Sequence, residues 1–110
     1  MGRVDTVTAA RARRAIDVLS GEAVVRAAYV FGSQAEGTAD EWSDIDLAAF
    51  VEGVELWDIE RRALAAVRMQ KIAGDDMELH LFPAASLSNP EPASFVAYIL
   101  RCGARVELSS

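Results

Sequence analysis

Residues 32–47 read GSQAEGTADEWSDIDL, a polar stretch between two apolar segments. β-Branched and aromatic residues dominate the segment before it, 23–31 (AVVRAAYVF), which predicts a buried strand that ends at Gly32. The segment 44–51 (DIDLAAFV) begins with polar and apolar residues in alternation and predicts a second strand. Two strands joined through a polar loop or short helix thus form the centre of the predicted fold.

Helical spacing and strand alternation account for most of the remaining chain. Helices are expected where apolar residues recur every three or four positions, and strands where alternating residues are bounded by Gly or Pro. The expected helices cover 5–20, 55–72 and 93–102, and the further strands cover 76–82 and 105–108. This order predicts an α+β (α/β-like) fold in which helices pack on a small mixed sheet of about four strands.

The length and composition indicate one folded domain, 1–110, and argue against two kinds of binding surface. The chain has 110 residues, of which 52% are hydrophobic and 25% charged, and this is enough apolar material for one core. Its formal charge of −6 disfavours direct nucleic-acid binding and a polybasic membrane surface. No apolar run approaches the ~18 residues of a membrane span, and Cys102 is the only cysteine, so a cytoplasmic protein without an intrachain disulfide is expected.

Asp44 and Asp46 are the first candidates for chemistry. Because successive strand side chains face opposite sides, both aspartates are expected on one face of the sheet, with Ile45 and Leu47 toward the core. Two neighbouring carboxylates repel each other, and a divalent cation is their natural partner. Oxygen ligands of this kind suit Mg²⁺, which completes its shell with water and substrate phosphates. The pair therefore predicts a metal site.

Gly32 and Ser33 supply the groups that a bound phosphate needs. A glycine at the end of a strand lets the backbone come close, free N–H groups point outward, and the serine hydroxyl can donate a hydrogen bond. Each motif alone is common in loops and at strand edges, and only the combination is specific. One loop thus joins a phosphate cradle to a metal site.

A Gly-Ser pair, a spacer and an Asp-x-Asp together resemble the signature of the nucleotidyltransferase superfamily related to DNA polymerase β. Residues 43–47 (SDIDL) closely match its second half. The short length and the order of elements resemble the minimal nucleotidyltransferases, the small partners of HEPN-domain ribonuclease toxins in toxin–antitoxin pairs. The likeness covers almost the whole chain as an order of elements, and residues 32–47 as a motif.

The resemblance implies that a nucleoside monophosphate, AMP from ATP, is transferred to a hydroxyl group while pyrophosphate leaves. It implies two Mg²⁺ ions ligated by Asp44 and Asp46, and β- and γ-phosphates held by Gly32 and Ser33. The family also uses a third acidic residue, usually Asp, which ligates the metal and helps to deprotonate the acceptor. Only the strand predicted over 76–82 offers such a residue here.

The predicted strand 76–82 (DMELHLF) leaves two choices for the third carboxylate. Its strict alternation puts Asp76, Glu78 and His80 on one face. Glu78 best fits the family pattern, as a catalytic residue and metal ligand, and Asp76 is the runner-up because it lies at the strand's start. Glu in place of Asp is a departure, since a misplacement of about 1 Å can cost ~10²-fold in rate. His80 either orients this carboxylate, touches the nucleotide or is a structural histidine.

The segment 27–60 contains nine acidic residues and neither Lys nor Arg. Many relatives carry an arginine soon after the Gly-Ser pair, whereas Gln34, Ala35 and Glu36 follow it here. Polyphosphate binding without metal should therefore be very poor, and nucleotide affinity should rise steeply with Mg²⁺. Trp42, in the same loop, is a candidate to stack on a base or to meet a partner.

Two functions remain open. The first is an enzyme that modifies a hydroxyl group of a partner protein, with a HEPN-type toxin as the acceptor that the resemblance implies. A chain this short leaves the acceptor, or one wall of the site, to another polypeptide or to a second copy in an oligomer. The alternative is an antitoxin that acts as a binding module by occupying its partner, its catalysis weakened by Glu78 and by the missing arginine.

Overall fold

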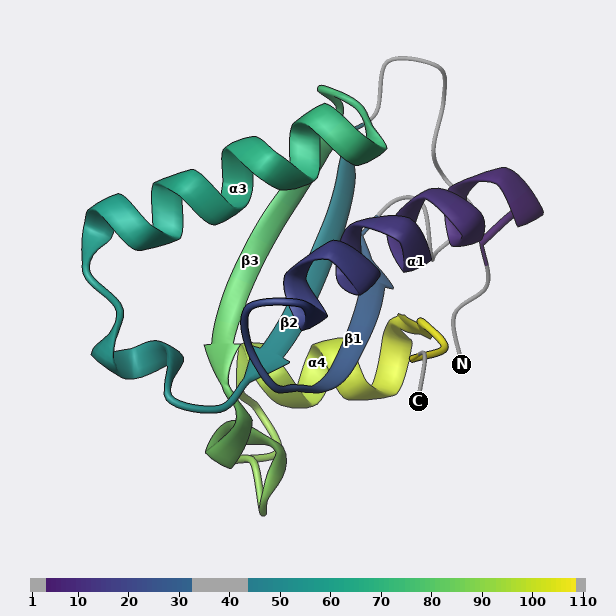
Figure 1. Cartoon of the computed structure of the whole chain (residues 1–110). Helices are drawn as coiled ribbons and strands as arrows, with labels where there is room; N and C mark the ends of the chain where they lie inside the picture. Colours follow the sequence, from purple (N-terminus) through teal and green to yellow (C-terminus); the bar gives the residue numbers. More distant parts are fainter. Residues whose placement is uncertain (1–3, 33–43, 109–110) are drawn as a thin grey trace.

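The two strands predicted on either side of the polar loop lie next to each other in one four-stranded sheet (Figure 1). The computed structural model describes residues 4–32 and 44–108. The strands are β1 (Val25–Phe31), β2 (Ile45–Val51), β3 (Met77–Pro83) and β4 (Ala104–Arg105). Their order is β3-β2-β1-β4, with β2 and β3 parallel and the other neighbours antiparallel. The predicted small mixed sheet is confirmed.

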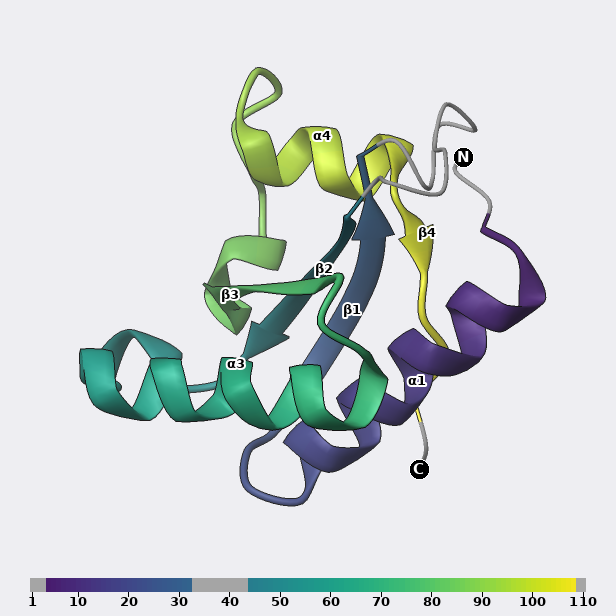
Figure 2. The same ribbon diagram turned by 90° about the horizontal axis from the view of Figure 1, so that it is seen from above.

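Helices cover both faces of this sheet. α1 (Thr6–Ser20) and α3 (Ile59–Ala73) pack against each other on one face, and α4 (Phe95–Cys102) lies on the opposite face (Figure 2). Two 3₁₀ helices, η1 (Val54–Leu56) and η2 (Ala84–Leu87), precede α3 and follow β3. The α+β class is confirmed. Within the described part of the chain, no helix has the length and apolar character needed to cross a membrane.

A short polar side chain begins each of the helices α1, α3 and α4. The side-chain oxygens of Asp5, Asp58 and Ser94 each accept the backbone N–H three residues later, at 2.7, 2.8 and 3.1 Å. These bonds satisfy N–H groups that have no partner inside the helix. The caps therefore determine where the helices start, and Asp58 explains why α3 begins later than the predicted residue 55.

The apolar residues around the start of α3 do not mark its buried face. Leu56, which lies just before the helix, and Ile59 are 87% and 86% exposed. The buried positions of α3 are Ala65, Met69 and Ala73. Arg62 explains the orientation: its Nη2 donates to the carbonyl oxygen of Val54 at 2.8 Å, which turns this side of the helix toward η1. The guanidinium thus gives a second hydrogen bond to a carbonyl oxygen that already accepts the backbone N–H of Trp57 at 3.0 Å.

Alternation along β2 separates two apolar clusters. Ile45 and Leu47 point to the cluster under α1 and α3, and Ala48 and Phe50 point to the cluster under α4. Because side chains alternate along a strand, Asp46 must share the α4 face. α4 is short and begins only at Phe95, and the side chain of Asp46 on this face is partly exposed.

Arg11 of α1 holds the turn that leads into β3. Its Nε donates to the carbonyl oxygen of Ala73 at 2.6 Å, and both of its terminal nitrogens donate to the carboxylate of Asp76. The backbone N–H of Ile45 in turn donates to the carbonyl oxygen of Asp76 at 2.7 Å. One short segment therefore ties α1, α3, β2 and β3 together at the point where β3 begins.

Asp76→Asn is expected to lower the free energy of unfolding at neutral pH by about 0.5–1 kcal/mol, the range for a partly exposed ion pair. The hydrogen bonds from Arg11 hold the pKa of Asp76 below its ordinary value of 3.8. A carboxyl group with a depressed pKa stabilises the fold above its unfolded pKa and loses this contribution as the pH falls through the folded pKa. The difference between wild type and variant should therefore persist from neutral pH to about pH 5 and shrink below about pH 4.

Urea unfolding at a series of pH values measures this difference. Asp75→Asn is the matched control, because Asp75 is the exposed neighbour in the same turn. An equal loss of stability in the control, or a difference that does not change with pH, would contradict the assignment to the Arg11–Asp76 pair.

Candidate functional site

Two acidic residues lie side by side on the open part of the α4 face. Asp46 of β2 and Glu78 of β3 are paired in register across the parallel strands. Neighbouring strands are about 4.8 Å apart, so residues paired in this way on one face have adjacent side chains. Tertiary pairing thus brings together two carboxylates that are 32 residues apart in the chain.

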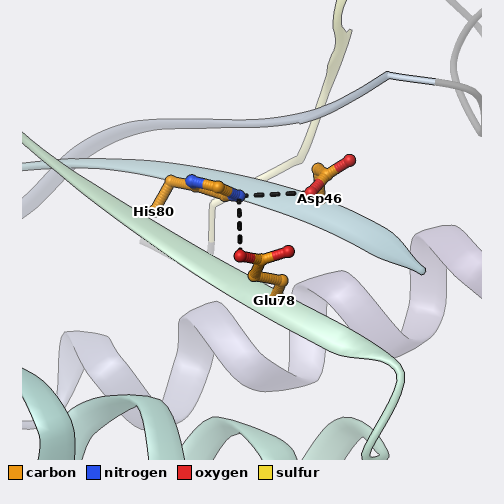
Figure 3. Close-up of side chains that lie close together, drawn as sticks. All are labelled: Asp46, Glu78 and His80. Atoms are coloured by element: carbon orange, nitrogen blue, oxygen red, sulfur yellow. Dashed lines mark hydrogen bonds and ion pairs between the residues drawn. The ribbon is translucent and has the colours of Figure 1, made fainter.

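His80 completes a group of three on this face. Two residues after Glu78 on β3, it points its Nε2 atom between the two carboxylates, 3.2 Å from Asp46 Oδ1 and 3.9 Å from Glu78 Oε1 (Figure 3). One nitrogen or oxygen atom of each of the three residues lies within 4.8 Å of the others. The side chains of Asp46 and His80 are each 29% exposed and that of Glu78 is 60% exposed, so the group opens to solvent.

The position of the His80 ring is set by its neighbours. Its partner across the parallel pair is Ala48, whose small side chain leaves room for the imidazole to lean toward Asp46. The ring of Phe31 contacts it edge to face, with centroids 5.1 Å apart, and Phe31 itself contacts Phe95 at 5.4 Å. These aromatic contacts help to fix the position of the ring.

Gly32 lies directly beside the carboxylate of Asp46. It has a φ of +79°, and a Cβ atom built on it would lie 2.8 Å from Asp46 Oδ2. The positive φ and the close contact both exclude a larger residue at this position. Phe31, the residue before it, is the register partner of Asp46 on β2. The end of β1 therefore brings a bare stretch of backbone against the acidic group, as a phosphate cradle requires.

The remaining predicted residues lie in different places. Asp44 is exposed and precedes β2, and among the described residues the clustered ligand atoms belong to Asp46, Glu78 and His80 and not to Asp44. Asp76 also precedes its strand, and its carboxylate is held by Arg11 on the α1 side, unlike the expected shared face with Glu78. Ser33 and Trp42 lie outside the described residues.

The donor set fits a divalent cation. Two carboxylates with an imidazole nitrogen between them form a common group of metal ligands, and a side chain at position 32 would crowd it. Asp46, Glu78 and His80 would hold the ion. A bound divalent cation neutralises phosphate charge and polarises the phosphorus–oxygen bonds of a nucleotide.

Sequence reasoning found Asp46, Glu78 and Gly32 but left the part of His80 open. Its position two residues after Glu78 on an alternating strand was the available signal. The contact between Gly32 and Asp46, and the support from Phe31, depend on the pairing of β1 with β2 and could not be derived from local pattern.

Comparison with known proteins is consistent with this geometry. The family model described as Polymerase beta, Nucleotidyltransferase matches residues 13–103, which include the acidic group and Gly32. Among curated proteins, none matches the chain. A solved structure from Sulfolobus solfataricus, assigned as a nucleotidyltransferase, superposes with a TM-score of 0.59 and covers 83% of this chain and 86% of its own; at 16% identity it supports the fold. The chain has a mixed sheet that carries this motif, and the family model matches most of the length of the chain. The chain is therefore a member of the polymerase beta nucleotidyltransferase family.

Proposed function

We propose that this protein is a metal-dependent nucleotidyltransferase that transfers AMP from ATP to a hydroxyl group of a partner protein. The observation that carries the proposal is the pairing of the Asp46 and Glu78 carboxylates beside the backbone of Gly32. Paired carboxylates bind a divalent cation, and backbone N–H groups donate hydrogen bonds to phosphate oxygens. The two requirements of nucleotidyl transfer thus meet at one place on the sheet.

Each residue has a distinct part in this reaction. Asp46 and Glu78, with Asp44 from the segment before β2, bind two Mg²⁺ ions, and Gly32 and Ser33 hold the β- and γ-phosphates. The acceptor oxygen forms a bond to the α-phosphorus while the bond to the α–β bridging oxygen breaks, and pyrophosphate leaves. Glu78 takes the acceptor proton on a carboxylate oxygen, a role that suits a side chain that is 60% exposed.

The acceptor is proposed to be a HEPN-type toxin, which would make this chain the antitoxin of the pair. Two features support a protein acceptor: the acidic group lies on an open sheet face, and Glu78 is largely solvent-exposed. A macromolecule that docks on this face would cover the group and exclude water from it. The net charge of −6 favours a partner with a basic surface.

The alternative is a binding module with weakened catalysis. It is favoured by the hydrogen bond between His80 and Asp46, at 3.2 Å, which occupies one oxygen of a metal-binding carboxylate. Asp44 is exposed and does not belong to the clustered ligand atoms of the described residues, which also favours this alternative. In this case the protein would neutralise its partner by complex formation alone.

ATP affinity is expected to increase at least ~10-fold when Mg²⁺ replaces EDTA, because carboxylates repel polyphosphate unless a cation lies between them. Isothermal titration calorimetry under both conditions measures the effect. Asp46→Asn should remove most of the increase, whereas Asp75→Asn, in the turn before β3, should keep it. Equal ATP affinity in EDTA and in Mg²⁺ would count against a nucleotide site here.

Gly32→Ala is expected to lower transferase activity by ~10²-fold, because the new methyl group displaces the Asp46 carboxylate from its position. Gly53→Ala is the matched control: Gly53 has a similar φ of +74° but no atom within 4 Å of a built Cβ. Both variants should lose about 1–2 kcal/mol of stability from the positive φ. Only Gly32→Ala should lose activity, and a similar loss in both variants would show that backbone strain alone is responsible.

Incubation with α-labelled ATP, Mg²⁺ and the product of the neighbouring gene separates the enzyme from the binding module. The enzyme should transfer label to the partner, and Asp46→Ala should abolish the transfer while leaving complex formation intact. A tight complex without label transfer, insensitive to Asp46→Ala, would identify the binding module. Transfer that is unchanged in Asp46→Ala would exclude Asp46 from catalysis.

A further inference from the structure

We propose that His80 joins Asp46 and Glu78 as a protein ligand of one metal ion and that this position prefers a first-row transition-metal ion, such as Mn²⁺ or Zn²⁺, over Mg²⁺. The inference rests on the proposed metal-dependent function and goes beyond it in naming the class of metal. It starts from the position of the Nε2 atom of His80, between the carboxylates of Asp46 and Glu78 (Figure 3).

The separations between the three side chains are close to those expected for ligands of a single ion. Protein ligands bind such metals at about 2.0–2.2 Å, so two ligands of one ion are at most about 4.4 Å apart. The Nε2 atom is 3.2 Å from Asp46 Oδ1 and 3.9 Å from Glu78 Oε1, and the whole set falls within 4.8 Å. Small side-chain rotations would therefore place all three around one centre.

The imidazole is held in the orientation that ligation requires. His80 and Glu78 project from the same face of β3 because they are two residues apart. Phe31, only 5% exposed, contacts the ring edge to face, and Ala48, the register partner of His80, has a small side chain. A ring held in this way presents Nε2 to the carboxylates with little freedom to turn away.

The type of ligand atom determines which metal ions bind more tightly when His80 is a ligand. Mg²⁺ takes oxygen ligands almost exclusively, whereas imidazole nitrogen is a good ligand for transition-metal ions. His80 should therefore strengthen the binding of Mn²⁺ or Zn²⁺ without strengthening that of Mg²⁺. Asp46 and Glu78 should contribute to the binding of both classes.

A different role for His80 is to orient Asp46 through their hydrogen bond, without touching the metal. His80→Gln distinguishes the two roles, because the glutamine amide can still donate a hydrogen bond to Asp46 but has no ring nitrogen for a metal. If His80 only orients Asp46, the variant should affect all divalent cations to the same degree.

Nitrogen NMR of the imidazole gives a direct readout, because His80 is the only histidine in the chain. The protein is used without a polyhistidine tag. Addition of Zn²⁺ should shift the Nε2 resonance strongly and leave that of Nδ1 much less affected, and Mg²⁺ should shift neither by a comparable amount. Zn²⁺ binding at Asp46 and Glu78 without a shift at Nε2 would overturn the proposal.

Calorimetric titration of Mn²⁺ and Mg²⁺ provides the second measurement. His80→Gln should weaken Mn²⁺ binding at least ~10-fold and change Mg²⁺ binding less than ~2-fold, while Glu78→Gln should weaken both. Thermal unfolding and circular dichroism confirm that each variant is folded. Equal weakening of both metals by His80→Gln would overturn ligation by His80 but leave the metal-dependent function standing. Failure of the wild type to bind any divalent cation would overturn both.

Discussion

The parallel pairing of β2 with β3 is the constraint on which the rest of the site depends. It sets Asp46 opposite Glu78 on the face that α4 covers only in part. Side chains alternate along a strand, so a slip of one residue would carry Glu78 to the opposite face, under α1 and α3. The hydrogen bonds of Asp76, from Arg11 and from the backbone of Ile45, lie at the start of β3 and secure this register.

One face of the sheet is packed into the core, and the other carries the candidate site. The face under α1 and α3 is covered by the larger of the two apolar clusters, which holds most of the buried apolar residues. On the other face, Phe50 and Ile99 are buried in the cluster under α4, and the acidic group is partly exposed to solvent. Because side chains alternate along each strand, the residues of one face pack into the core, and the residues of the other face include those of the candidate site. Carboxylates can remain beside each other at the open side because solvent screens their repulsion.

Local sequence predicted the elements better than it predicted their orientation. The strands around residues 32–43, the alternation of β3 and the three helices follow from periodicity, and the structure confirms them. The buried face of α3 did not follow from periodicity, because this helix carries more than one apolar stripe: Ile59, like Leu56 just before the helix, faces solvent. The choice between the stripes depends on Asp58 and Arg62, whose partners are backbone groups near the start of the helix. Such contacts have no periodic signature in sequence.

The sequence by itself determined the motif, the types of side chain and the faces of the strands, because these follow from composition and from a period of two residues. Tertiary structure decided which residues meet. It placed Glu78 and not Asp76 beside Asp46, brought His80 between the two carboxylates, and set Gly32 against Asp46. These contacts join residues on different strands, and only the order and register of strands in the sheet can create them.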